Sequence, residues 1–541
     1  MIRRFGFAFL ILFFTGCFCS AQDGSEVVQN QFNKFVSPLS PQSADFVRYG
    51  NAPISYFTGQ ADVKIPLYTY KDADFEFPIY AAYNSSGFIP NKRDGIIGLN
   101  WFLGVGGVIT RTINGVADDR QGYQDGNVPH GLLYGIRNNL GVQSVSRTGV
   151  FNDPSLGDVN SGYFWTIGGG CELEPDKFTF SMPGYNGSFF LQNDGTVRVE
   201  GNKPLKVDLS GVSDQAFNDY YNINDSEIVI TADNGYKYYF GGNVKYLEYS
   251  VVLATNSPIR SPEINAWHLT KIEAPNGRIA SFQYSDFVQP MGSGSYTKSS
   301  TNHFQASVTK FQTGKSSSSI AKEMVLGLPF YHVDVFADND IYDVIEASKT
   351  VYLKSITVDN NLIELAYSAK EKDFYNNYNG LLDADHGLKL DNITVKSGGT
   401  VLYTFQFGYN YLKDGQRLFL TSLTESGKNP YLLDYYLPVG DFPSPLITDI
   451  DYWGFWVGGY NLAGLLIPKA DIMSTGDIVY TSFERWPNPN FSVVGQLKTL
   501  TYPTNGYSRY EYEGNSYSKR LERRSSSDFK SEELLRSSRF E

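Results

Sequence analysis

Serine and cysteine are the residues of this chain from which nucleophilic catalysis would be expected first. A nucleophilic hydrolase needs a Ser or Cys next to a base, and a third group that orients the base. Ser293 stands in a Gly-Ser-Gly-Ser run within a Ser-rich stretch, and not between a strand and a helix as a nucleophile elbow requires. Cys171 follows three glycines and has no His near it in the sequence. We therefore predict no catalytic residue, and a buried or inert thiol at Cys171.

Paired carboxylates are the groups that a glycosidase uses, one on each side of the sugar bond. Glu172, Glu174 and Asp176 alternate along the chain and would line one face of a strand, although a proline interrupts that strand. The pair Asp118-Asp119 is interpreted as part of a turn. These patterns favour structural carboxylates over a glycosidase site.

Metal sites need His, Cys, Asp or Glu at characteristic spacings. The histidines are His130, His268, His303, His332 and His386, and no two share a ligand spacing. Two acidic groups are spaced loosely like a calcium loop, namely Asp338, Asp340 and Asp343, and Asp383, Asp385 and His386. Neither group has the glycine and terminal glutamate of an EF-hand, so we interpret both as solvated turn carboxylates and predict no metal.

A glycine-rich turn at residues 104–107 is the one stretch that invites comparison with a nucleotide-binding loop. A β-type run follows it, whereas a phosphate-binding loop opens a helix. The sequence therefore predicts glycines at a bend in a sheet, and no nucleotide or other cofactor.

Trp453 and Trp456 are the best candidates for binding a ligand by stacking. They lie in the run Asp451-Tyr452-Trp453-Gly454-Phe455-Trp456, and exposed aromatic rings stack on sugars. The alternative for the same residues is the aromatic core of a β structure. A secreted or surface glycan-binding module is therefore an alternative function for the chain.

Short strands joined by tight turns are the elements that must position all these residues. The 541-residue chain is 15% aromatic, with 39 Tyr, 38 Phe and 52 Gly, a composition typical of many short strands. From Phe46 to Asp119, aromatic and β-branched runs end at Gly, Pro, Asn or Ser, without a helical period. The predicted fold class is all-β, with antiparallel hairpins in an extended β-sheet shell or sandwich-like assembly and little helix.

The opening block, residues 46–119, also resembles a known family. Its motifs are an "IPL" strand at 65–67, a "P-I…Y-x-S-x-G" strand at 78–87, a "G-x-G-W-x-L" turn at 98–103 and a "G-G-V-I-T-R" strand at 106–111. The pattern is similar to the start of Rhs/YD-repeat proteins of the Bacteroidetes type, and of SpvB-like and toxin-complex B proteins. Asn100 stands where the family has Gly, and Asn tolerates a positive φ. The resemblance implies a hollow β shell that encloses or presents a toxin-like cargo.

Four later segments repeat one formula. Each begins Leu-x-x-Ile or Leu-x-x-Leu, turns through Asn or Gly, and ends in an alternating strand, which predicts one hairpin per segment. The segments are Leu269–Tyr284, Leu353–Tyr367, Leu390–Phe407 and Leu497–Tyr512. The turn Asn276-Gly277-Arg278-Ile279, followed by Tyr284, resembles a degenerate YD repeat.

Irregular segments separate or follow these hairpins. Residues 120–160 are predicted to be a long surface insertion and residues 295–319 a mobile Ser-rich loop. Ile320–Val325 is predicted to form a short helical turn. Residues 516–541 alternate basic, acidic and Ser residues, which predicts a disordered charged tail.

The N-terminus has the pattern of an export signal. Arg3 and Arg4 precede an apolar stretch too short to span a bilayer, and small residues precede Gln22. Cleavage is expected after Ala21, which predicts a secreted or cell-surface protein, and a lipoprotein modified at Cys17 is the alternative. Loss of the two arginines would move the formal net charge from -12 to -14, which argues against nucleic acid as a partner. No second apolar span is long enough for a membrane helix.

The chain is therefore expected to contain these regions: signal peptide 1–21, leader or linker 22–44, opening β region 45–250, hairpin region with degenerate YD-like units 251–515, and charged tail 516–541. The predicted function is that of an exported, non-enzymatic structural or interaction protein. It would form the N-terminal shell part of an Rhs/YD-repeat system, in toxin encapsulation or at the cell surface. The expected partner is a downstream Rhs or toxin cargo, or a cell-surface glycan, and a secreted hydrolase is the third hypothesis.

Overall fold

The chain is represented by a computed structural model. It describes residues 40, 42–43, 61, 63–85, 87–122, 130–140, 171–172, 174–216, 223–253, 262–286, 304–325, 328–372, 387–413, 416–459, 470–472, 478–480 and 487–514. In this part of the chain, strands far outnumber helices, and no helix is long and apolar enough to cross a membrane.

The strands in the first half of the chain are β1 Val63–Lys71, β2 Glu76–Tyr83, β3 Trp101–Gly104, β4 Val108–Thr112, β5 Lys177–Met182, β6 Tyr185–Leu191, β7 Val197–Gly201, β8 Leu205–Asp208, β9 Glu227–Ala232, β10 Lys237–Gly241, β11 Leu247–Leu253, β12 Glu263–Glu273 and β13 Ile279–Tyr284. Those in the second half are β14 Phe304–Val325, β15 Leu328–Lys349, β16 Leu353–Val358, β17 Asn361–Ala369, β18 Leu388–Ser397, β19 Thr400–Tyr411, β20 Leu418–Glu425, β21 Tyr431–Tyr435, β22 Ala470–Ile472, β23 Ile478–Tyr480, β24 Leu497–Thr501 and β25 Tyr507–Arg509. The helical segments are α3 Leu132–Arg137, η1 Val244–Tyr246 and α5 Pro489–Ser492.

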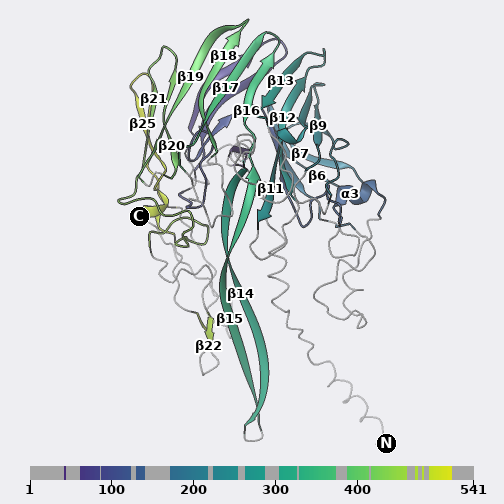
Figure 1. The fold of residues 1–541 in the computed structure, drawn as a ribbon, viewed down its shortest axis with the longest axis vertical. Coiled ribbons are helices and arrows are strands. Elements are labelled where there is room, and N and C mark those ends of the chain that lie inside the picture. Colours follow the sequence, from purple (N-terminus) through teal and green to yellow (C-terminus); the bar gives the residue numbers. More distant parts are fainter. Residues whose placement is uncertain are drawn as a thin grey trace, which may run out of the picture.

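Two large antiparallel sheets share strand β12 (Figure 1). One sheet runs in the order β8-β9-β10-β12-β13-β16-β17-β18-β19-β20-β21-β24-β25. The other runs β7-β6-β5-β4-β12-β11-β15-β14. Ala266–His268 of β12 pair with β4, whereas Leu269–Glu273 pair with β10. The predicted fold class is confirmed: the regular elements of the described residues are almost all antiparallel strands.

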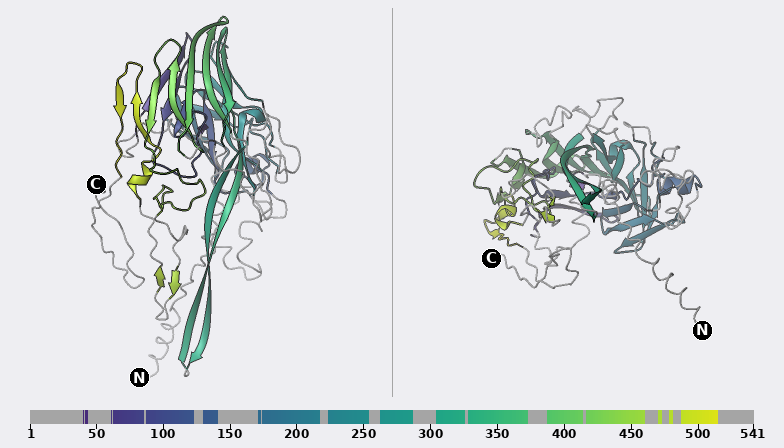
Figure 2. Two further views of the ribbon diagram at one scale, coloured as in Figure 1. Left: turned by 60° about the vertical axis from the view of Figure 1, so that its left-hand side comes forward. Right: turned by 90° about the horizontal axis from the view of Figure 1, so that it is seen from below.

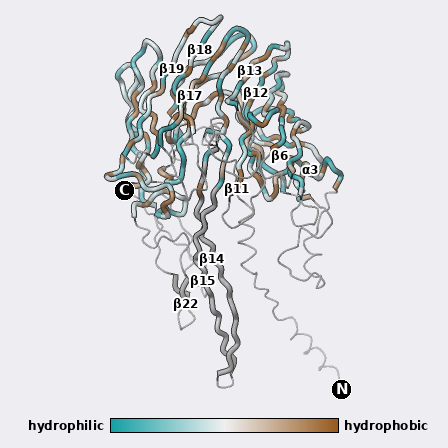
Figure 3. Tube along the Cα trace, in the orientation of Figure 1, coloured by the Kyte–Doolittle hydropathy of each residue, from teal (hydrophilic) through white to brown (hydrophobic). Residues whose placement is uncertain are grey.

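Alternating burial explains why these residues form sheets. In β13, the buried residues Ala280, Phe282 and Tyr284 alternate with partly or fully exposed ones, as expected of a strand with one face in the core. Figure 3 shows brown and teal residues alternating along the strands of the long sheet. The apolar faces of both sheets and of the opening block join in one core.

The opening block divides between two places in the fold. Strands β1, β2 and β3 form their own small sheet, while β4 leaves it and pairs with β5 and β12. The small sheet lies against the long one, as the two views of Figure 2 show. Trp101 is fully buried, its Nε1 donates to the hydroxyl of Tyr435 at 3.0 Å, and Leu497 N donates to the hydroxyl of Tyr83 at 2.9 Å. Strands β1, β2 and β3 therefore pack against the long sheet, while β4 is part of the other large sheet.

The turn before Trp101 needs a left-handed backbone. Asn100 has φ +63°, a conformation that Asn tolerates better than most residues. Its neighbour Gly98 has φ +99°, and a Cβ there would lie 2.8 Å from Leu420 N. The turn thus sits directly on β20, where Leu99 N donates to Leu418 O at 2.8 Å.

The four predicted hairpins are confirmed, and each is closed by a tyrosine. The hairpins are β12–β13, β16–β17, β18–β19 and β24–β25. The closing tyrosine donates its hydroxyl hydrogen to the carbonyl of the leucine that opens the unit: Tyr284 to Leu269 (2.7 Å), Tyr367 to Leu353 (2.8 Å), Tyr409 to Leu390 (2.6 Å) and Tyr512 to Leu497 (2.8 Å). The third unit therefore ends at Tyr409, two residues beyond the predicted Phe407.

A fifth unit of the same kind was not predicted from the sequence. It runs from Leu420 to Tyr435 through strands β20 and β21, and the Tyr435 hydroxyl donates to Leu420 O at 2.6 Å. Its sequence signal is Leu420-x-x-Leu423 with a turn at Gly427, whose φ is +81°. We call Tyr284, Tyr367, Tyr409, Tyr435 and Tyr512 the closing tyrosines.

Two predictions for irregular segments were wrong. Ile320–Val325 is the end of strand β14 and not a helical turn, and the described part of the Ser-rich stretch also belongs to β14. β14 and β15 pair residue by residue from Phe304 with Lys349 to Val325 with Leu328, and this hairpin extends away from the sheets in Figure 1. Such pairing is a tertiary effect that local propensity does not reveal. The predicted surface insertion at 120–160 contains helix α3 in its described part.

Candidate functional site

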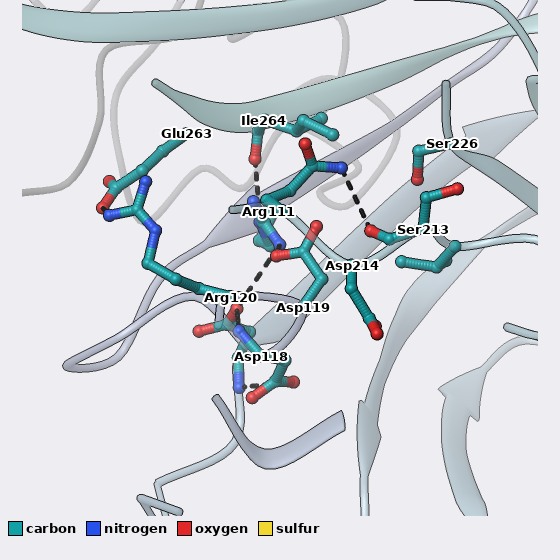
Figure 4. A network of polar contacts seen from close by, with 12 residues as sticks. Arg111, Asp118, Asp119, Arg120, Ser213, Asp214, Ser226, Glu263 and Ile264 are labelled. Carbon is teal, nitrogen blue, oxygen red and sulfur yellow. Dashed lines mark hydrogen bonds and ion pairs between the residues drawn. The ribbon is translucent and has the colours of Figure 1, made fainter. Parts of the chain in front are cut away.

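A buried charged cluster lies where β4 meets β12. Arg111 on β4 is 2% exposed, and its Nη1 donates to Asp119 Oδ1 at 2.7 Å while Nε donates to Ile264 O at 2.8 Å (Figure 4). Asp176 Oδ2 lies 3.8 Å from the same Nη1. Beside it, Arg120 Nη1 donates to Glu263 Oε1 at 3.2 Å. The cluster therefore ties β4, the following turn and the start of β12 together.

The carboxylates of this cluster accept hydrogen bonds from the turn that follows β4. Asp118 and Asp176 are joined by two reciprocal hydrogen bonds: Asp118 N donates to Asp176 Oδ2 at 2.9 Å, and Asp176 N donates to Asp118 Oδ2 at 3.2 Å. Asn114 N donates to Asp176 Oδ1 at 3.0 Å, and Val116 N donates to Glu172 Oε2 at 2.7 Å. Glu172 and Asp176 thus both bind backbone N–H groups of this turn, and they lie before strand β5, which begins at Lys177, so the prediction that they line one strand face was wrong.

Burial determines the charge of these carboxyls. It raises the pKa of Asp118 and of Asp176, with further raising by the neighbouring carboxylates, and it raises the pKa of Glu172 to about 9. Raised carboxyl pKa values are also what a general acid needs. However, Asp176 and Asp118 are 0% and 2% exposed, so neither can reach a sugar bond. The arrangement supports a structural role and not a glycosidase pair.

Cys171 lies beside a histidine that is distant in sequence. His130 and Cys171 form an isolated parallel β-bridge, and Glu172 N donates to His130 O at 2.9 Å. Burial lowers the pKa of His130 and raises the pKa of Cys171. His130 Nδ1 accepts from Gly122 N at 2.8 Å, and the ring stacks on Tyr134. Because both groups are held in their neutral forms, the pair lacks the thiolate that a nucleophile needs.

The loop from Asp449 to Gly459 places Trp453 and Trp456 in different environments. Trp453 is 66% exposed and its neighbour Tyr452 is 56% exposed. Trp456 packs against Phe88 and Phe491, with ring centroids 6.1 Å and 5.0 Å away. Trp453 is therefore the more exposed of the two tryptophans, and Trp456 is half-buried.

Asp451 makes the tip of this loop rigid. Its buried carboxylate accepts from Trp453 N at 2.8 Å and from Phe455 N at 2.9 Å, and Asp451 N donates to Phe455 O at 2.8 Å. Trp456 N donates to Phe88 O at 3.1 Å, which fixes the loop to the opening block. An exposed ring on a rigid turn loses little conformational entropy when it binds a ligand.

Several residues considered from the sequence are placed differently or lie outside the described part. Asp338, Asp340 and Asp343 belong to strand β15 and are not turn residues, because β15 continues through them in register with β14. Ser293, His303 and the group Asp383, Asp385 and His386 lie outside the described residues. Among the residues that the structure describes, no three His, Cys, Asp or Glu side chains are grouped so as to hold a metal ion.

Comparisons with known proteins give distant likenesses. No protein-family model matches the sequence, and no curated protein does. Solved structures to which it is similar include a crystal structure of TcdB2-TccC3 (9% identity, TM-score 0.27, 74% of this chain and 17% of that chain). Another is the Tc holotoxin pore of Photorhabdus luminescens, with 10% identity and a TM-score of 0.31, where the match covers 71% of this chain and 16% of that chain. A third is the N-terminal domain of the effector protein SpvB from Salmonella typhimurium strain LT2. Its identity is 10% and its TM-score 0.28, and the match covers 68% of this chain and 98% of that chain.

The chain spans about a sixth of the toxin-complex chains it matches, 17% and 16% of their lengths. With identities of 9–10% and TM-scores of 0.27–0.31, the likeness to toxin-complex chains and to the SpvB N-terminal domain is distant.

Proposed function

We propose that this chain is an exported, non-enzymatic structural protein that forms part of a β-sheet wall in an Rhs/YD-type system. The observation that carries the proposal is the series of hairpins closed by a tyrosine-to-leucine hydrogen bond, stacked edge to edge over the opening block. The family resemblance of residues 46–119 supports the same function. In this proposal the wall encloses or presents a toxin-like cargo, or contacts a cell surface.

The polar interior supports a scaffold rather than a catalyst. The carboxylates beside Arg111 accept backbone N–H groups, and the neutral Cys171 thiol lies beside a neutral His130. These groups are committed to holding turns and strands in place. They would not need to change protonation during a reaction cycle.

A substrate panel tests the non-enzymatic part of the proposal. The chain lacking residues 1–21 is incubated with a broad set of glycans, esters and peptides, and no turnover above a heat-treated sample is expected. Hydrolysis that Glu172→Gln or Cys171→Ala abolished, with the fold intact by circular dichroism, would contradict the proposal. Glu174→Gln is the matched control, because Glu174 is exposed on the same segment.

A glycan-binding surface is the second candidate function, and the exposed ring of Trp453 on its rigid turn favours it. The wild-type chain on a glycan array is expected to bind a subset of sugars, and Trp453→Ala to lose that binding. Tyr507→Ala is the control, because Tyr507 is 70% exposed and lies on another element, strand β25. The absence of binding on a broad array, or equal binding by Trp453→Ala, would remove this candidate.

A further inference from the structure

Glu248 on β11 binds a short segment from the N-terminal region of the chain. Glu248 is 2% exposed and accepts from Ser40 N (3.2 Å), Ser40 Oγ (2.8 Å) and Ser43 Oγ (3.0 Å). Its Oε1 also lies 3.0 Å from His268 Nε2 on β12. Ser40 and Ser43 are themselves 4% and 1% exposed. A segment predicted to be part of a leader or linker is therefore bound inside the protein at a charged side chain.

Gln42 connects the same segment to the opening block. Leu103 N donates to Gln42 Oε1 at 3.0 Å, and Gln42 Nε2 donates to Leu103 O. Leu103 lies in β3, whose other edge is occupied by β2. The carboxamide thus supplies the donor and acceptor that a neighbouring strand would supply. We call Ser40, Gln42 and Ser43 the N-terminal strap.

The strap lies in a space that the rest of the fold leaves open. A cavity of about 40 Å³ borders Gln42 and Ser43, and its other walls include His268, Tyr284 and Tyr367. This volume has room for no more than a few water molecules beside the strap. Without the strap, Glu248 would be a buried carboxylate with fewer donors, which is costly.

The charges around Glu248 fit a polar, uncharged ligand. The buried amine of Lys349, whose pKa burial lowers well below its ordinary value, is held by backbone groups, since its Nζ donates to the carbonyl oxygens of Val244, Lys245 and Leu247 at 2.8–2.9 Å. Burial opposes the charged form of Glu248, but the bonds from His268 and Ser40 outweigh burial and lower the pKa of Glu248. The carboxylate thus stays ionised and attracts hydroxyl and amide donors.

We propose that Glu248, His268 and the free edge of Leu103 form a peptide-binding site for a Ser- and Gln-bearing segment, occupied in cis by the N-terminal strap. The occupied site fastens the N-terminal region to strand β12, which both large sheets share. This inference does not depend on the proposed function.

A peptide supplied in trans tests the site in the full chain. The strap is disabled by Ser40→Ala, Gln42→Ala and Ser43→Ala together, which leaves the receptor residues unchanged. A fluorescein-labelled peptide of residues 36–47 is then titrated and followed by anisotropy. It is expected to bind the disabled chain at least about tenfold more tightly than the wild-type chain, whose site is already occupied. Equal affinities, or no binding to the disabled chain, would overturn the proposal.

Two further variants separate specific binding from general loosening. Adding Glu248→Gln to the disabled chain is expected to weaken peptide binding at least about tenfold, because a carboxamide cannot accept from all the strap donors. Adding Glu273→Gln, which changes a half-buried carboxylate at the other end of β12, is expected to leave binding unchanged. A peptide with the same residues scrambled should not bind.

Hydrogen exchange in a single variant tests the docking of the strap even if the triple variant does not fold. In the single variant Gln42→Ala, the Leu103 amide loses its partner and is expected to exchange at least about tenfold faster than in the wild-type chain. The amide of Ala81, in the neighbouring strand β2, is the internal reference. Unchanged exchange at Leu103 would contradict the docking of the strap.

Discussion

Each closing tyrosine donates one hydrogen bond from a hydroxyl that burial keeps protonated. Burial raises the pKa of Tyr284, Tyr409 and Tyr435 well above the ordinary value, and the carbonyl that each hydroxyl reaches belongs to the first leucine of its own hairpin. A buried carbonyl without its donor carries a desolvation penalty. The tyrosine and leucine therefore identify a unit in the sequence and also stabilise it.

Tyr367→Phe tests this hydrogen bond without changing the ring. We expect the free energy of unfolding to fall by about 1–2 kcal/mol, because Leu353 O loses its donor inside the protein. Urea unfolding followed by fluorescence measures the change. Tyr507→Phe should have no measurable effect, since this ring is 70% exposed. A loss of the same size in both variants would show that the buried hydroxyl has no special role.

Glu172→Gln tests the raised pKa of the Glu172 carboxyl. The pKa of Glu172 is about 9 in the folded chain and about 4.3 when unfolded, so between these pH values the folded state binds more protons. Wild-type stability should therefore fall as pH rises through that window, and the variant should lack this contribution. At pH 8.5 the variant is expected to melt roughly 2–4 °C higher relative to wild type than at pH 5. Glu174→Gln should shift both melting temperatures equally, and a pH-independent difference for Glu172→Gln would refute the pKa assignment.

Ion pairs between turns connect the opening block to the hairpins of the long sheet. Arg278, in the β12–β13 turn, pairs with Asp72 and Asp74 from the β1–β2 turn and with Asp359 from the β16–β17 turn. One guanidinium thus holds three turns of separate hairpins at one edge of the molecule. Such a planar fork binds carboxylates in a way that a lysine does not reproduce.

Arg278→Lys is expected to loosen these turns while leaving the strands intact. Hydrogen exchange should become faster at the amide of Asp74, which donates to Asp72 Oδ1 at 2.8 Å, because Asp72 loses its fixed partner. Exchange in the middle of β13 should not change. Lys71→Ala is the control, since its pair with Glu76 is 67% and 60% exposed. Equal exchange rates in the wild-type and Arg278→Lys chains would mean that the turns do not depend on Arg278.

The sequence predicts local elements well and distant partners poorly. Alternating burial and Asn or Gly turns predicted four hairpins, because both signals lie within about twenty residues. The pairing of His130 with Cys171 and the reciprocal hydrogen bonds of Asp118 with Asp176 join residues far apart in the chain, and no local pattern records them. The fifth hairpin was missed although Leu420, Gly427 and Tyr435 carry the formula. The helical turn expected at Ile320–Val325 was wrong, because pairing with β15 makes it a strand.

The molecule as a whole is held by one apolar core that the opening block shares with both large sheets. Strand β12 pairs with β4 in one sheet and with β10 in the other, so the two sheets cannot separate without breaking it. Residues from the opening block reach β13, β20, β21 and β24. We therefore expect the opening block and the hairpins to unfold together.

Alkaline unfolding tests this shared core through the closing tyrosines. Unfolded tyrosines lose their protons near pH 10, whereas the folded pKa values are higher, so stability is retained below pH 10 and lost as pH rises above it. Exposed tyrosines such as Tyr507 should titrate near pH 10 with the circular dichroism unchanged. The remaining rise in tyrosinate absorbance at 295 nm should come at higher pH, together with the change in circular dichroism. Complete tyrosine titration at ordinary pKa values, with the circular dichroism unchanged, would show that the rings are not buried in one core.

The wall proposed for this chain is tested most directly with a partner. The chain without residues 1–21 is co-expressed with the product of the reading frame that follows its gene, and the purified mixture is treated with trypsin. We predict a stable complex in which the partner is digested much more slowly than when it is alone. The contradicting result is a partner that elutes separately and is digested at the same rate with and without the chain.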